Sequence, residues 1–178
     1  MHIGLVHAWI LVLPVVAIFA AVTLVRRDVA RRLGDMTGYT TREKAATVIA
    51  SLSTYPFMVL TLFTPFSPNT TALIAGAAVY AAGLIGFLLS VLVFSKTPSQ
   101  RPATGGVYRI SRNPMYVSAL FVFAGITIMT LDLRLAVALI VIAVLQHGMI
   151  LAEERMCHGR YGRDYEEYLR RTPRYLFK

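Results

Sequence analysis

The chain has 178 residues, of which 56% are hydrophobic and only 15% are charged. A soluble domain is usually about 25% charged and about 45–50% apolar, so this composition excludes an ordinary soluble protein. The net charge of +9 would suggest nucleic acid in a soluble protein, but here the basic residues lie between apolar runs, as in the cytoplasmic loops of membrane proteins, and no nucleic-acid partner is expected.

Five apolar runs are candidates for crossing a bilayer, which takes about 20 residues each. In chain order they cover residues 8–25, 45–66, 72–94, 115–131 and 135–151. The first has no basic segment before it and no clear cleavage site after it, so it reads as a retained span. The last two are 17 residues long, which at 1.5 Å per residue is about 25 Å, shorter than the ~30 Å hydrocarbon core.

The charges between the runs predict a topology. Residues 26–44 carry six Lys or Arg and three acids, and residues 95–112 carry four basic residues and no acid. Residues 67–71 are uncharged, and residues 132–134 form a tight turn with one acid, Asp132, and one base, Arg134. By the positive-inside rule, five spans with the N-terminus outside and the C-terminus in the cytoplasm satisfy every loop. We therefore predict one all-α domain, a polytopic membrane helix bundle over residues 1–178.

The third run carries small residues at a spacing of seven, Gly76, Gly83 and Ser90. Small residues on one face allow helix backbones to approach closely. This face can pack within the chain or across a dimer, so an oligomer is possible but not implied. The three spans of residues 1–94 are expected to form a scaffold.

The tail after the fifth run has the pattern of an amphipathic helix. Tyr161, Tyr165 and Tyr168 fall at i, i+4 and i+7, with charged residues between them. Gly159 and Gly162 are expected to break this helix from the fifth run. Because tyrosine rings favour the headgroup depth, we expect an interfacial helix over the cytoplasmic mouth of the bundle.

The linker before the fourth run has features of an anion-binding site. Pro114 keeps Asn113 out of helical geometry, so the helix should begin at or just after this proline. The free N–H groups of a helix start favour an anion, and Arg112 adds a bidentate donor. Gly106 upstream allows the backbone to approach a ligand. A basic linker followed by a proline-started helix explains the same residues without a ligand.

The end of the fifth run carries two adjacent carboxylates, Glu153 and Glu154. At a helix C-terminus they would oppose the macrodipole and would require a cationic partner, either a protein arginine or a bound cation. His147 lies seven residues before Glu154 and shares its face, either as a packing residue or as a ligand contact. The single cysteine, Cys157, and the scattered histidines show no metal-ligand spacing, and no metal is expected.

Together the two segments offer an anion grip, a carboxylate pair and aromatic rings. S-adenosylmethionine carries a carboxylate, a cationic sulfonium and a flat heterocycle, and is compatible with all three. Its sulfonium can be held by carboxylates and by aromatic faces through cation–π attraction.

The order of these elements resembles a known family. Gly106-Val107-Tyr108, then Arg112-Asn113-Pro114-Met115-Tyr116, Glu153-Glu154-Arg155 and a tail from Tyr161 to Arg174 resemble the isoprenylcysteine carboxyl methyltransferase and phospholipid methyltransferase superfamily. The resemblance covers residues 105–176.

The resemblance implies an integral membrane methyltransferase that uses S-adenosylmethionine and releases S-adenosylhomocysteine. The C-terminal half, residues 95–178, would bind the cofactor on the cytoplasmic side of a prokaryotic inner membrane, and a lipophilic acceptor, such as a prenylcysteine-like carboxylate or a lipid amine, would enter from the bilayer. The residues expected at the cofactor are Gly106, Tyr108, Arg112, Asn113, Pro114, Tyr116, His147, Glu153 and Glu154.

Within that set, we expect Arg112 to grip the cofactor's carboxylate and Glu154 to contact its sulfonium or ribose. Many members of the family have His where this chain has Asn113, which cannot act as a base, so no acid–base role is assigned there. Two alternatives remain: a non-enzymatic scaffold or permease-like protein, and an NADPH-dependent membrane reductase of related architecture.

Overall fold

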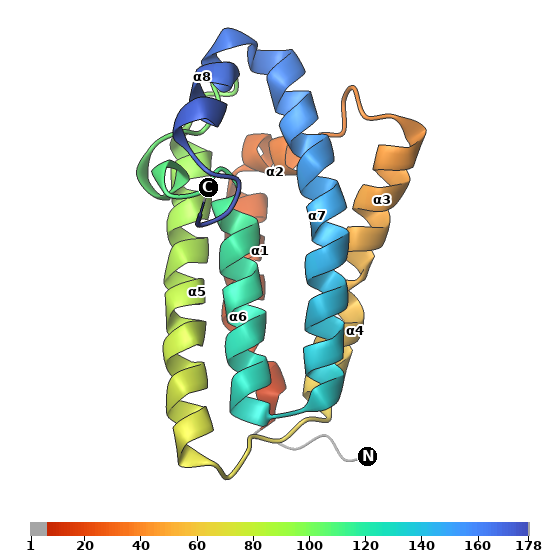
Figure 1. Ribbon diagram of the computed structural model, residues 1–178, viewed down its shortest axis with the longest axis vertical. Helices are drawn as coiled ribbons and strands as arrows, with labels where there is room; N and C mark the ends of the chain where they lie inside the picture. Colours follow the sequence, from red (N-terminus) through yellow and green to blue (C-terminus); the bar gives the residue numbers. More distant parts are fainter. Residues whose placement is uncertain (1–6, 178) are drawn as a thin grey trace.

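The computed structural model describes residues 7–177, and within that range the chain forms helices and no β-strand. In order they are η1 (Ala8–Leu11), α1 (Leu13–Val25), α2 (Arg27–Leu33), α3 (Thr41–Leu52), α4 (Thr54–Leu62), α5 (Thr70–Lys96), η2 (Gly106–Arg109), α6 (Pro114–Thr130), α7 (Leu133–Tyr161) and α8 (Arg163–Arg171). The all-α prediction is confirmed, and Figure 1 shows the elongated bundle that these helices make.

Four helical stretches are long and apolar enough to cross a membrane, namely Ala8–Val25, Thr41–Leu62, Thr70–Lys96 and Leu133–Tyr161. The predicted fourth span corresponds to α6, a shorter apolar helix of 17 residues. The second stretch is broken into α3 and α4 at Ser53. Pro56 accounts for the break, because it has no N–H to donate to the carbonyl of Leu52 and its ring crowds that carbonyl.

Helix α7 is longer than the sequence predicted. The apolar run ends at Leu151, but the helix continues through charged residues to Tyr161. Hydropathy marks the part of a helix that suits lipid, and a helix can continue beyond it into water. Gly162 ends α7 with a φ of 54°, as expected, whereas Gly159 lies inside the helix. Glu153 is therefore about two turns from the C-terminus, so the helix dipole is not the reason for a cationic partner. Glu154 nevertheless has the expected arginine partners, Arg112 and Arg174.

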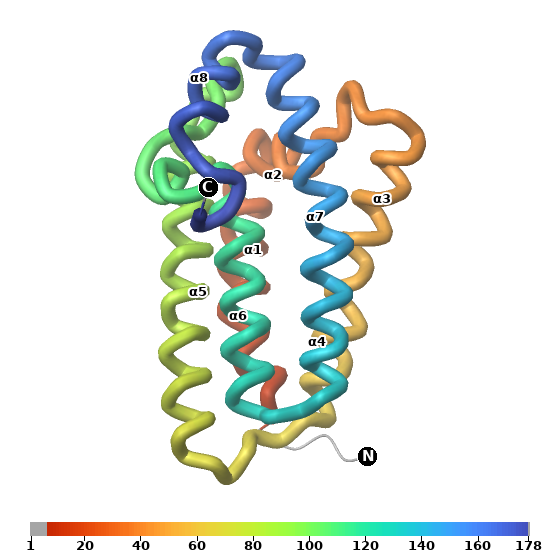
Figure 2. Tube along the Cα trace, in the orientation of Figure 1, coloured from red at the N-terminus to blue at the C-terminus, as the bar shows by residue number. Residues whose placement is uncertain are grey.

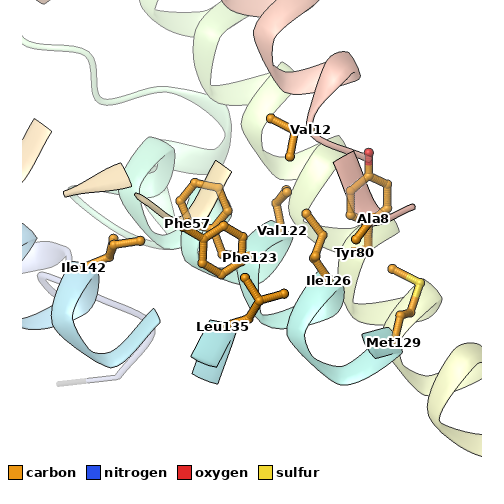
Figure 3. Packing of buried hydrophobic residues seen from close by; sticks show 10 residues of the cluster. All are labelled: Ala8, Val12, Phe57, Tyr80, Val122, Phe123, Ile126, Met129, Leu135 and Ile142. Carbon is orange, nitrogen blue, oxygen red and sulfur yellow. The ribbon is translucent and has the colours of Figure 1, made fainter. Parts of the chain in front are cut away.

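The close-packed centre of the bundle is the contact between α5 and α6. A Cβ atom added at Gly83 would lie 2.6 Å from the backbone nitrogen of Val122, and one at Gly125 would lie 2.5 Å from that of Tyr80. Figure 3 shows Val122 and Tyr80 in the buried cluster around this contact. Within the described chain, the small residues of the third run thus pack against α6.

Replacing Gly125 with leucine should destabilise the bundle, because the side chain would be forced into the backbone of α5. Overpacking of this kind costs about 1–3 kcal/mol of stability. Because a side chain at residue 125 would meet backbone atoms of α5, we expect a loss at the upper end of that range. Gly148→Leu is the matched control, since nothing lies within 4 Å of a Cβ added there. Thermal unfolding in detergent should show a lower midpoint for Gly125→Leu alone.

The two ends of the bundle differ in character. Helix α8, the 97–113 linker and α2 gather at one end, and the first described residues lie at the other, as Figures 1 and 2 show. After α8 the chain turns back along α6, where Tyr175, Leu176 and Phe177 line an apolar groove with three α6 residues. The first described helix and α8 thus lie at opposite ends, as an odd number of spans requires, and the N-out orientation stays a prediction.

Candidate functional site at the α8 end

A cavity of about 340 Å³ lies under α8. Its volume falls within the range of about 300–1,000 Å³ that is usual for small-molecule sites. Residues of α1, α2, α3, α5, α6, α7, α8 and the linker all contribute to the wall. The polar and aromatic residues on it include Phe19, Arg32, Ser51, Phe87, Phe94, Tyr108, Arg112, Asn113, Tyr116, Gln146, Glu153, Tyr161, Tyr165 and Tyr168.

The linker reaches this wall through a local fold that its sequence dictates. Gly106 adopts a φ of 55° at the start of η2, which turns Tyr108 inward, where its ring is buried. Asn113 has a non-helical φ of −124°, and α6 begins at Pro114, as predicted. The Tyr168 hydroxyl donates to the Tyr108 carbonyl oxygen at 2.7 Å and joins α8 to the linker.

Glu154 is the centre of a buried ion-pair cluster. Its carboxylate accepts from Arg112 Nε and Nη2, both at 3.2 Å, and from Asn113 Nδ2 at 2.9 Å. Arg174, beyond α8, donates to the same carboxylate through Nε at 3.0 Å and Nη2 at 2.9 Å. Only 9% of the Glu154 side chain is exposed. The cluster joins the start of α6, the middle of α7 and the C-terminal segment.

Arg112 is also engaged with the backbone. Its Nη1 donates to the carbonyl oxygens of Leu169 and Thr172 at 3.1 and 3.2 Å. Each of the three guanidinium nitrogens of Arg112 therefore has a protein acceptor, and both oxygens of Glu154 have protein donors. This geometry favours a structural role for the pair over the contacts with a cofactor that the sequence suggested.

Glu153 occupies a different position from its neighbour. It lies on the cavity wall and accepts a hydrogen bond from the Tyr116 hydroxyl at 2.6 Å. Arg155, two residues on, pairs instead with Glu43 of α3. Among the two adjacent carboxylates, Glu153 is thus the one that a ligand in the cavity would meet.

Two wall residues carry polar groups that the sequence reading did not place there. Gln146 is 7% exposed, and its Oε1 atom is buried with no hydrogen-bond partner. Arg32 of α2 lies with its guanidinium carbon 4.4 Å from the centre of the Phe94 ring, and its Nη1 donates to the Thr97 carbonyl oxygen. Arg32 could not be recognised as a wall residue from the sequence, because the positive-inside rule already explains a basic residue at that place.

The predicted site residues divide into two groups. Tyr108, Arg112, Asn113, Pro114, Tyr116 and Glu153 lie on the cavity wall. Gly106, His147 and Glu154 lie off it. His147 instead faces the C-terminal segment, where its Nδ1 is 2.5 Å from the Tyr175 hydroxyl.

The tail helix forms as predicted, but its aromatic face packs inward. Tyr165 and Tyr168 are buried against Ala103 and Tyr108 of the linker, and burial raises the pKa of both hydroxyls. The stripe therefore roofs the cavity, and these two rings are not at the outer surface where they would meet headgroups.

The segment between α2 and α3 is tied to α7 by two ion pairs. Arg160 donates to Asp35 at 2.5 Å, and Arg155 donates to both Glu43 oxygens and to the Gly38 carbonyl oxygen. Hydrogen bonds from Thr37 and then from Arg160 lower the pKa of Asp35 to about 2.

Because this pKa lies below the unfolded value of about 3.9, ionised Asp35 stabilises the fold above pH 4, and that contribution is lost as the pH falls through 2. Arg160→Ala should raise the pKa of Asp35 part of the way toward 3.9, read from the carboxyl carbon shift by NMR. Arg155→Ala, which removes the partner of Glu43, should leave the Asp35 titration unchanged. An unaltered titration in Arg160→Ala would show that Thr37 alone holds the carboxylate.

The fold and the cavity together define an integral membrane protein with a polar, aromatic-lined site at one end of its bundle. A family model of the phospholipid methyltransferases matches residues 73–164, just over half of the chain. The chain belongs to this family, which confirms the resemblance seen in the sequence, and membership implies methyltransferase activity in general. Searches of the curated proteins and of the solved structures find no match.

Proposed function

We propose that this protein transfers a methyl group from S-adenosylmethionine to a lipophilic acceptor at the cytoplasmic face of its membrane. The observation that carries the proposal is the cavity wall, which is lined by Glu153, Arg32, several tyrosines and Gln146, whose side-chain oxygen has no partner. The family supports the reaction type, and the chemistry of the wall supports the donor.

The residues present fit this cofactor. A buried polar atom without a partner costs about 1–3 kcal/mol, so the Gln146 oxygen calls for a donor such as an amino group or a hydroxyl of the ligand. Tyr116, Tyr161 and Glu153 line the cavity, and aromatic rings and a carboxyl group are the groups that can hold a cationic sulfonium. Arg32 is the arginine proposed for the cofactor's carboxylate, since Arg112 is already engaged by protein acceptors.

When bound, the cofactor supplies a methyl group activated by a positively charged sulfur. The protein's own part is to hold the two reactants in line and to exclude water, and positioning of this kind can supply roughly 7–11 kcal/mol of the barrier. Helix α8 and the linker close the cavity from the water side through the Tyr168–Tyr108 hydrogen bond.

The charges support a cytoplasmic site. The α2 segment, the linker and α8 carry many basic residues, whereas the turn between α6 and α7 holds Asp132 paired with Arg134. By the positive-inside rule, this distribution favours a cytoplasmic position for the basic end.

Gln146→Leu gives a two-sided test of the cofactor site. Removing the unpaired oxygen should raise the apo protein's thermal midpoint, while the affinity for S-adenosylhomocysteine, measured by calorimetry in detergent, should fall about tenfold. Val144→Leu is the control and should change neither value, since Val144 lies on the same helix, is 68% exposed and lines neither this cavity nor its neighbour. Absence of measurable binding to the unsubstituted protein would refute the proposed cofactor, and mass spectrometry of any co-purified nucleotide would show whether NADPH takes its place.

A further inference from the structure

A second cavity, of about 260 Å³, adjoins the first on the side of α3. Six residues line both: Arg32, Leu33, Ser51, Tyr116, Met149 and Glu153. The hydrogen-bonded pair of Glu153 and Tyr116 therefore stands at the junction, with one cavity on each side. A group held in the second cavity can meet a group held in the first beside the Glu153 carboxylate.

The second cavity opens toward the lipid-facing surface of α3 and α4. Val48, Leu52 and Tyr55 line it and are at the same time 46%, 56% and 60% exposed. Since α3 and α4 form a membrane-spanning stretch, those exposed faces contact acyl chains. An apolar tail can therefore lie between these residues while its head reaches the junction.

A residue with an unpaired polar atom also lines this second cavity. The Thr47 hydroxyl is buried and has no hydrogen-bond partner. Other helical threonines of this chain bond to a carbonyl three or four residues earlier, as Thr61 and Thr130 do. The hydroxyl of Thr47 makes no such bond, although the residue itself lines the second cavity.

The other flank of the site is covered. Arg174 pairs with Glu154, Tyr175 contacts His147, and Leu176 lies with Phe121 along α6. Figure 1 shows this C-terminal segment folded back beside α6 and α7, away from α3. Entry from the bilayer is thus directed to the α3 side.

From these observations we infer that the second cavity is the acceptor site, entered between α3 and α7, and that it takes a single-tailed amphiphile whose nucleophilic head carries a proton, such as an amine, a hydroxyl or a thiol. This inference rests on the proposed methyl transfer and goes further by assigning the acceptor's place and chemical class.

The class follows from the charge at the junction. A carboxylate head would bring a second acid group against Glu153, and Asp35 on the same wall is itself paired with Arg160. Arg32, the cation on this wall, is engaged by the Thr97 carbonyl oxygen and the Phe94 ring and is assigned above to the cofactor's carboxylate. A protic head instead donates a hydrogen bond to Glu153. In the reaction the bond from the nucleophile to the methyl carbon forms as the carbon–sulfur bond breaks, the sulfur keeps that electron pair, and the head's proton passes to the Glu153 carboxylate and then to water.

The test measures binding of dodecylamine to the full chain in nanodiscs saturated with S-adenosylhomocysteine, by displacement of a fluorescent dodecyl amine. Thr47→Phe fills the second cavity without touching the first, so dodecylamine affinity should fall at least tenfold while S-adenosylhomocysteine affinity stays unchanged. Ile49→Phe is the matched control, since Ile49 lies on the same helix, is 55% exposed and lines neither cavity. Leu52→Trp, at the mouth, is a second obstruction and should act like Thr47→Phe.

The outcomes distinguish a failure of the proposed methyl transfer from a failure of the acceptor site. Loss of S-adenosylhomocysteine binding in the unsubstituted protein would refute the proposed function itself. Retained cofactor binding with equal dodecylamine affinity in Thr47→Phe, Leu52→Trp and Ile49→Phe would overturn the acceptor site. Dodecanoate that displaces the probe better than dodecylamine, dodecanol and dodecanethiol would overturn the protic class.

Discussion

Glu154→Ala is expected to lower the free energy of unfolding by about 3–5 kcal/mol, the cost of leaving a buried charge without its partner. The variant leaves Arg112 without its carboxylate partner. The side chain of Arg112 is only 11% exposed, and within the described chain it is hydrogen-bonded to no carboxylate other than Glu154. It also releases Arg174 and Asn113, so the C-terminal segment loses its attachment to α7.

Arg112→Ala should cost less, because Glu154 keeps two hydrogen bonds from Arg174. The order of the two variants thus tests whether the cluster is centred on the carboxylate. Chemical unfolding in detergent, followed by near-ultraviolet circular dichroism, measures both. Glu166→Ala, at an exposed pair with His158, is the control and should change stability by less than about 1 kcal/mol.

The same variants test the sequence-based roles of Arg112 and Glu154. If either residue contacts the cofactor, S-adenosylhomocysteine affinity should fall even under conditions where the variant remains fully folded. If the cluster is structural, the affinity of the folded fraction should stay near that of the unsubstituted protein. A Glu154→Ala variant as stable as Glu166→Ala would show that the ion-pair cluster does not stabilise the fold.

The spans could be predicted because their signals are local. A run such as residues 72–94 is apolar throughout, and a bilayer-spanning helix requires only that property. The start of α6 could also be predicted, since Pro114 restricts its own backbone and that of Asn113. The small-residue face of α5 could be recognised, but its partner could not, because α6 presents Gly125 at a distance that only the fold sets.

The pairings at the site could not be predicted for the same reason. Two adjacent carboxylates have opposite surroundings because a helix turns by about 100° per residue, which directs Glu154 to Arg174 and Glu153 to Tyr116. Nothing in the sequence says which face meets the C-terminal segment. Arg32 reaches the wall from a part of the chain some 80 residues earlier, so its spacing to Arg112 carries no periodic signal.

Glu153→Gln should reduce methyl transfer to a protic acceptor by about 10²–10⁴-fold, the usual contribution of a positioned general base. The amide keeps the size of the side chain and can still bond to Tyr116, but it cannot take the proton of the head group. S-adenosylhomocysteine formation from S-adenosylmethionine and dodecylamine, measured by mass spectrometry, gives the rate. Dodecylamine affinity should change far less than turnover, because the cavity of α3 and α4 that holds the tail is untouched.

Tyr116→Phe is the partner variant, since it removes the hydrogen bond to Glu153 and leaves the carboxylate in place. We expect a smaller loss, about tenfold, together with a shifted pH–rate profile, because Tyr116 acts by positioning and tuning the carboxylate. Glu153→Asp should recover part of the activity lost in Glu153→Gln, with the shorter side chain further from the head group. Equal turnover in Glu153→Gln and the unsubstituted protein would show that proton removal occurs elsewhere, and the carboxylate at the junction would then serve only to hold charge.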